Sequence, residues 1–138
     1  MALGIYCSGG FGREKYDLAH LINIKYYHWS DIVFIDDVSE AENANGGIIY
    51  RYEVFKQKFP PGNAKITIAI GEPKYRRTMA DKVISDGYSL QSLIHPDVKI
   101  GTGTTIGDGT IIAYYPYISC KNTKYPVQCH LLGMCRLL

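Results

Sequence analysis

An isoleucine recurs every six residues in the second half of the chain, at Ile94, Ile100, Ile106, Ile112 and Ile118. A period of six fits neither the 3.6 of an α-helix nor the 2 of a β-strand. It fits a chain wound around a triangular prism, with one short strand on each face and the isoleucine pointing to the axis. The repeat therefore predicts a parallel β-helix. A Gly/Thr-rich edge hairpin is the alternative.

The six-residue repeat ends before the chain does. Continuing it would require apolar residues at two positions that hold Lys124 and His130. At about eighteen residues per coil, the repeat supplies fewer than two coils, whereas repeat folds usually need three or more units. We therefore interpret residues 120–138 as an anomalous tail. The hypothesis that we favour is a premature stop or frame change near Cys120, and the alternative is the first part of a longer β-helix.

Composition excludes several classes of protein. The chain has 138 residues, of which 46% are hydrophobic and 20% charged, which is typical of a globular protein. A net charge of +2 without a basic stripe argues against nucleic-acid binding, and we assign Lys74, Arg76 and Arg77 to a solvated helix face. No apolar run has the length of a membrane span or the features of a signal peptide. We therefore expect a cytoplasmic protein that does not bind membranes.

The tail contains potential zinc ligands, but their spacing is poor. Cys120, Cys129, His130 and Cys135 lack the C-x2-C pair of zinc knuckles. We interpret them as incidental and expect no metal site.

The first ninety residues alternate between strand and helix patterns. Apolar runs predict strands, and amphipathic or capped runs predict helices; the first helix should bury Leu18, Ala19, Leu21 and Ile22. This order predicts an open parallel sheet with helices on both faces. The expected strands are 3–7, 32–37, 47–50 and 65–71, and the expected helices are 13–22, 52–59 and 72–86.

Three strand ends carry residues that suit a nucleotide. Ligands of such sheets bind at the carboxyl ends of the strands. There the sequence has a glycine-rich turn at 9–12 that opens a helix, an acidic pair at 36–37, and Gly71. A helix N-terminus favours phosphate, and carboxylates accept hydrogen bonds from ribose hydroxyls. Cys7 replaces the first glycine of a full dinucleotide fingerprint, and a purely structural turn is the alternative.

Four stretches of the sequence resemble the bacterial sugar acyltransferases of the nucleotide-sugar N-acetyltransferase and sialic-acid O-acetyltransferase group. They are IYCSGGFGRE at 5–14, FIDD at 34–37, AIGEPKYRR at 69–77 and LIHPDVKIGTGTTIGDGTII at 93–112. The resemblance implies a Rossmann-like domain over residues 1–92. It also implies that residues 93–119 form the first coils of a left-handed β-helix, before the tail at 120–138.

The resemblance further implies a function in glycan biosynthesis. Members of this group transfer an acetyl group from acetyl-CoA to a nucleotide-linked sugar. The N-terminal domain would hold a UDP-sugar through Gly9, Gly10, Phe11, Gly12, Asp36, Asp37 and Gly71. The catalytic histidine and the acetyl-CoA groove of the homotrimer belong to later coils than this chain contains. We therefore name no catalytic residue, and expect neither bound acetyl-CoA nor activity from this chain alone.

Two functions of other classes remain open. The first is a non-catalytic nucleotide-binding module. The second is a fragment of an NAD-type oxidoreductase, which the glycine turn and the acidic pair also suit.

Overall fold

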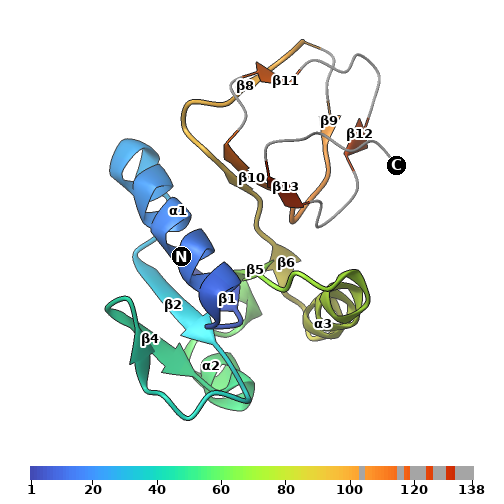
Figure 1. Ribbon diagram of the computed structural model, residues 1–138. Coiled ribbons are helices and arrows are strands. Elements are labelled where there is room, and N and C mark those ends of the chain that lie inside the picture. The colour runs from blue at the N-terminus through green and yellow to red at the C-terminus, as the bar shows by residue number, and fades with distance from the viewer. Residues whose placement is uncertain (103–104, 115–116, 119–123, 126–129, 133–138) are drawn as a thin grey trace.

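The computed structural model describes residues 1–102, 105–114, 117–118, 124–125 and 130–132 (Figure 1). A six-stranded sheet has the order β3-β4-β2-β1-β5-β6, in which all pairs are parallel except β3 with β4. The first strand therefore lies in the middle of the sheet. The strands are β1 (Ala2–Tyr6), β2 (Asp31–Ile35), β3 (Asn43–Ala44), β4 (Gly47–Tyr50), β5 (Ala64–Ile68) and β6 (Ser89–Leu90).

Helices cover both faces of this sheet. The helices α2 (Tyr52–Lys58) and α3 (Pro73–Ser85) share a core with Tyr6 and other residues on one face, while α1 (Gly10–Tyr26) packs with Leu3 and Ile5 on the other. Adjacent residues of β1 thus point to opposite cores, as the pleat requires. A short 3-10 helix spans Pro61–Asn63. The predicted α/β fold with helices on both faces is confirmed.

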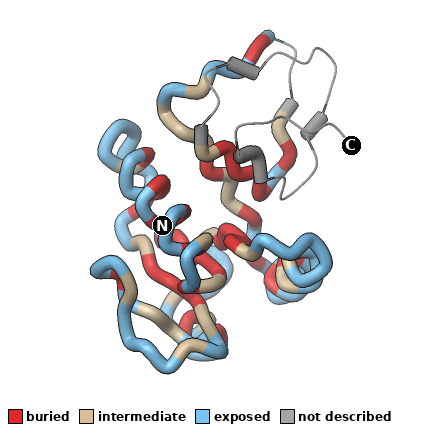
Figure 2. The backbone as a smooth tube through the Cα atoms, in the orientation of Figure 1, coloured by how far each residue is buried: buried red, intermediate tan, exposed pale blue. Residues whose placement is uncertain are grey.

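Several element limits differ from the prediction. Helix α1 begins at the glycine turn and runs to Tyr26, longer at both ends than the predicted 13–22. Its buried stripe includes Lys15 and Tyr16, while Leu21, which we expected to be buried, is 44% exposed. Figure 2 shows buried and exposed residues recurring along α1. No helix in the described part of the chain combines the length and the apolarity needed to cross a membrane.

After residue 92 the structure contains only short strands, which pair in parallel. β7 pairs with β10, and β8 with β11, at a spacing of eighteen residues; β9 pairs with β12, and β10 with β13, at nineteen. A chain wound in triangular coils makes such pairs, and two of these strands lie in the predicted tail. The strands are β7 (Leu93–Ile94), β8 (Lys99–Ile100), β9 (Thr105–Ile106), β10 (Ile111–Tyr114), β11 (Tyr117–Ile118), β12 (Lys124–Tyr125) and β13 (His130–Leu132).

The left-handed β-helix, the domain limits and the anomalous tail stay predictions. Cys120, Cys129 and Cys135 lie outside the described residues, as does most of the tail. The two halves of the described chain share a core, because Leu93 and Ile111 pack in the same cluster as Ala19 of α1.

Candidate functional site

The N-terminus of α1 differs from those of the other two helices. At α2 the carboxylate of Asp37 accepts a hydrogen bond from the Tyr52 amide at 2.9 Å. At α3 the carboxylate of Glu72 accepts from two amides of the first turn. The N-cap of α1 is Gly9, which makes no side-chain cap, and the first turn contains no acidic residue. Among the described residues, no carboxylate of the chain caps the first turn of α1, and the dipole of this helix favours an external anion there.

The turn before α1 depends on a close backbone approach. A Cβ on Gly12 would lie 1.9 Å from the carbonyl oxygen of Cys7, so no other residue fits there without moving the backbone. Cys7 itself has a φ of 100°, in the region that normally favours glycine. The backbone thus has a glycine-like conformation at the position where the dinucleotide fingerprint has its first glycine.

Asp36 links the glycine turn to the loop after β2. One carboxylate oxygen accepts hydrogen bonds from the backbone amide and the hydroxyl of Ser8, at 2.9 and 2.7 Å. The other oxygen accepts from the amides of Val38 and Ser39, each at 2.9 Å. Burial raises the pKa of Asp36, but these hydrogen bonds outweigh it and hold the pKa below the ordinary value. All four acceptor positions of the carboxylate are therefore used within the chain.

Asp37 retains acceptor capacity. One of its oxygens accepts from the Tyr6 hydroxyl at 3.1 Å and the other from the Tyr52 amide, so about two of four lone-pair positions are left. The residue is exposed. Burial, and then the charge of Asp37, raise the pKa of Tyr6, so the phenol stays protonated and donates. Asp37 can thus accept a further hydrogen bond from a ligand.

Two arginines lie beside these strand ends. The Arg76 guanidinium donates to the carbonyl oxygens of Ile70 and Gly71, each at 3.4 Å. The Arg13 guanidinium lies 4.0 Å from where a Cβ on Gly10 would be. We predicted that Arg76 and Arg77 lie on a solvated helix face. Arg77 does so and pairs with Asp81 at 3.7 Å, whereas the Arg76 side chain turns back to the loop after β5.

The structure brings most of the predicted site residues together. Gly9 and Gly10 start α1, Ser8 joins this turn to Asp36, and a Cβ on Gly12 would also lie 3.9 Å from Ala69. Gly71 is exposed, and a Cβ there would have nothing within 4 Å. Phe11 packs against the core of α1. We did not predict the contributions of Ser8, Arg13, Lys15 and Arg76.

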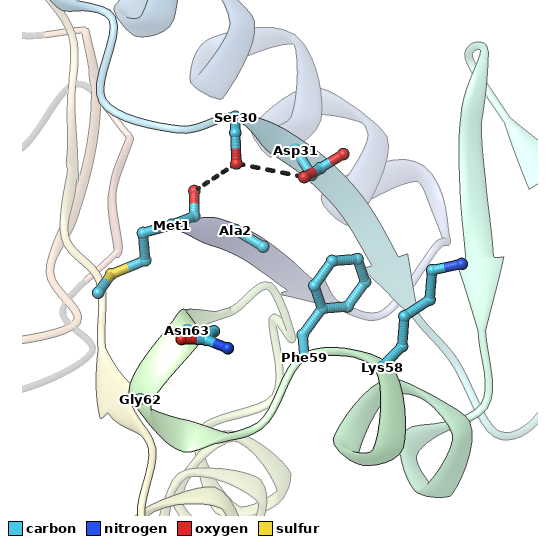
Figure 3. Close-up of a pocket in the computed structure, with 8 residues that line it drawn as sticks. All are labelled: Met1, Ala2, Ser30, Asp31, Lys58, Phe59, Gly62 and Asn63. Atoms are coloured by element: carbon cyan, nitrogen blue, oxygen red, sulfur yellow. Dashed lines mark hydrogen bonds between the residues drawn. The ribbon is translucent and has the colours of Figure 1, made fainter.

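A hollow lies at the end of the sheet opposite the glycine turn (Figure 3). It has a volume of about 340 Å³ and is formed where β1, β2 and β5 begin. Ser30 bridges the Met1 carbonyl and the Asp31 carboxylate at its rim. Ligands of parallel sheets bind at the carboxyl ends, so we place the candidate site at the glycine turn. The residues around the hollow are Met1, Ala2, Ser30, Asp31, Lys58, Phe59, Gly62 and Asn63.

Comparison with known proteins identifies a family. A family model described as the PglD N-terminal domain matches residues 2–83. A GDP-perosamine N-acetyltransferase from Escherichia coli O157:H7 is 30% identical over 118 residues, which are 84% of this chain and 52% of that protein. The chain thus spans about half the length of this relative.

Solved structures agree. The acetyltransferase domain of PglB from Neisseria gonorrhoeae FA1090, in complex with acetyl coenzyme A, has 27% identity and a TM-score of 0.69, over 80% of this chain and 51% of that one. WeeI from Acinetobacter baumannii AYE has 25% identity and a TM-score of 0.68, over 81% of this chain and 52% of that one. The resemblance to nucleotide-sugar acetyltransferases is confirmed, and acetyl-CoA is the co-substrate of the family.

Proposed function

Because the chain belongs to the PglD N-terminal domain family, we propose that it binds a nucleotide sugar at the carboxyl ends of β1, β2 and β5. The observation that carries this proposal is the N-terminus of α1. Carboxylates of this chain occupy the first turns of α2 and α3, whereas α1 begins with glycines. A diphosphate supplies the charge that the amides of this turn favour.

The site residues then divide into two roles. Gly9, Gly10 and Gly12 let the diphosphate approach the backbone, and Phe11 and Gly71 line its two sides. Asp37 accepts hydrogen bonds from the nucleoside, since it is exposed and has acceptor capacity left. Asp36 contributes by holding the Ser8 turn in place.

We propose a UDP-linked amino sugar as the ligand. The E. coli relative is named for GDP-perosamine, so GDP is the competing nucleotide. NAD is the third, because the backbone at Cys7 has a glycine-like conformation. Preference for UDP or GDP would favour a sugar acetyltransferase, and preference for NAD would favour the oxidoreductase alternative.

The reaction that we propose for the complete enzyme is acetyl transfer. The sugar amine attacks the thioester carbonyl of acetyl-CoA, a base takes the amine proton, and the CoA thiolate leaves. The complete enzyme would act as a cytoplasmic homotrimer with a left-handed β-helix, in bacterial glycan biosynthesis. This chain spans about half of its relatives, and we propose that alone it binds the nucleotide sugar without turning it over.

Calorimetry with UDP, GDP, NAD and acetyl-CoA tests the binding. We expect UDP to bind more tightly than NAD. We also expect Asp37→Asn to weaken UDP binding by about 1–3 kcal/mol, because it removes hydrogen bonds to a charged acceptor. An exposed acid elsewhere on the chain provides the control, Glu40→Gln. Tighter binding of NAD, or no binding of either nucleotide diphosphate, would overturn the proposal.

A thiol-release assay tests the predicted inactivity. It uses acetyl-CoA with UDP- and GDP-linked amino sugars, and a relative of full length as the positive control. We expect no thiol release above the uncatalysed rate, because loss of a general base alone costs about 10²–10⁴ in rate. Turnover at an ordinary enzymatic rate would show that this chain contains a complete catalytic site.

A further inference from the structure

Lys15 is a buried cation beside the glycine turn. Its side chain is 1% exposed. It lies one turn into α1, and helical side chains lean toward the N-terminus of their helix. The ammonium is accordingly 4.4 Å from the centre of the Phe11 ring, four residues earlier. The charge of Lys15 thus lies near the first turn of α1.

This ammonium lacks a close counter-charge. Its ion pair with Glu14 has a nitrogen–oxygen distance of 3.8 Å, beyond hydrogen-bonding range, and the Glu14 side chain is 68% exposed. Among the residues that the structure describes, no hydrogen bond is made by the Lys15 ammonium. A buried charge is costly unless it is paired and hydrogen-bonded. The Phe11 ring offsets part of that cost.

We propose that Lys15 is the internal counter-charge for the anionic group of the ligand at the N-terminus of α1. This inference rests on the proposed function, and it assigns to Lys15 a positioning role at the same site. The ammonium is buried and lies against the Phe11 ring, so the attraction acts through surroundings of low dielectric constant, where Coulomb interactions weaken less than in water. In the free protein the buried Lys15 ammonium is unfavourable, and a bound anion would offset that cost.

Coupling between binding and protonation follows from this arrangement. Burial lowers the pKa of Lys15, and the charge of Glu14 opposes that shift only in part. Of the charged groups on α1 and on the described strands packed against it, Glu14 is the one that acts on Lys15. A bound anion favours the charged amine and raises its pKa. Binding should therefore take up protons at a pH between the lowered value and the ordinary 10.5.

The first experiment uses the unaltered chain. Calorimetry of UDP, GDP and inorganic phosphate is repeated in two buffers of different protonation enthalpy, at several pH values up to the ordinary 10.5. Inorganic phosphate has no group that titrates at about pH 9, so it isolates the proton uptake of the protein. We expect a buffer-dependent enthalpy that corresponds to fractional proton uptake. Binding without proton uptake would overturn the role of Lys15 and leave the proposed function intact. The absence of binding by all three probes would overturn the proposed function instead.

The second experiment compares Lys15→Met with Lys25→Met. Lys25 lies at the other end of α1, is exposed, and has its ammonium 5.4 Å from the Tyr26 ring centre, so it serves as a matched control. Lys15→Met should raise the melting temperature, because a buried charge is removed. It should also weaken UDP and inorganic phosphate binding about tenfold or more and abolish proton uptake. Lys25→Met should change neither stability nor affinity appreciably.

A purely structural lysine would behave differently. Loss of its packing and of its contact with Phe11 would lower the melting temperature and leave the affinity unchanged, and that result would overturn the inference. If Lys15→Met did not fold, the proton uptake of the unaltered chain would decide the question.

Discussion

Ser8 donates two hydrogen bonds to the same carboxylate oxygen of Asp36, one from its backbone amide at 2.9 Å and one from its hydroxyl at 2.7 Å. The other oxygen accepts from two amides of the loop after β2. One side chain therefore holds together two loops that are far apart in the sequence and adjacent at the site.

Replacement of this carboxylate should destabilise the protein and change its response to acid. Asp36→Asn loses acceptor capacity, and we expect the free energy of unfolding at neutral pH to fall by about 1–3 kcal/mol. Because the pKa of Asp36 is below the ordinary 3.8, its contribution is fully present above that value and is lost as pH falls through the lowered pKa. Urea unfolding of Asp36→Asn and Glu40→Gln from neutral pH down to about pH 3 checks both points. Equal stability of the two variants would contradict the role of Asp36.

Gly10 and Gly12, in the first turn of α1, should differ in how well each tolerates replacement by alanine. Gly12→Ala places a Cβ 1.9 Å from the Cys7 carbonyl oxygen, so we expect the free energy of unfolding to fall by about 1–3 kcal/mol or more, as at other overpacked sites. Gly10→Ala meets only the Arg13 guanidinium at 4.0 Å and should fold normally but bind UDP less tightly. Thermal unfolding and calorimetry of both variants test this. Full stability of Gly12→Ala would contradict the close contact.

The backbone at Cys7 should prefer glycine. A non-glycine residue at positive φ destabilises the folded state by about 1–3 kcal/mol. Glycine removes this strain but increases the conformational entropy of the unfolded chain, so part of the gain in stability is lost. Since φ of Cys7 is 100°, we expect Cys7→Gly to raise the free energy of unfolding by about 1 kcal/mol. Cys7→Val, with a β-branched side chain, should lower it. Denaturant unfolding measures both, and the reverse order would argue against the observed conformation.

Stability in alkaline solution should report on Lys15. Its lowered pKa means that, between that value and the ordinary 10.5, the unfolded chain binds more protons than the folded one. Stability attributable to Lys15 therefore rises with pH through this window. The advantage of Lys15→Met over the unaltered chain should shrink as pH rises toward 10.5, in denaturant titrations at several pH values. A constant difference would exclude the titration of Lys15.

The parallel sheet could be predicted because its strands are short apolar runs buried on both faces, such as those that became β1 and β5. The strand pairs β7–β10 and β8–β11 follow from the six-residue spacing, since three faces of six residues place Leu93 beside Ile111. The ends of α1 were harder to predict. Glycines weaken the helical pattern at its start, and the left-handed Tyr27 that caps its end is not a usual capping residue.

Side-chain roles at the site depend on tertiary contacts that sequence spacing does not show. The donors to Asp36 include Ser8, 28 residues earlier, so the saturation of its acceptors could not be foreseen. The burial of Lys15, in contrast, could have been suspected from the sequence. It occupies the same helical face as Leu18, Ala19 and Ile22, where an apolar residue is expected. A charge on that stripe predicts either a buried ion or a different helix orientation.

The central place of β1 also affects how the chain folds during synthesis. All five of its residues are buried, and it pairs with both β2 and β5. The edge of β1 that pairs with β2 can form once Ile35 has left the ribosome, but the other edge stays unpaired until Ile68 has followed. At about 5–20 residues per second, an apolar strand at the N-terminus waits for several seconds without its second partner. Until then β1 presents an apolar strand with one unpaired edge, which is a template for wrong pairing with another chain.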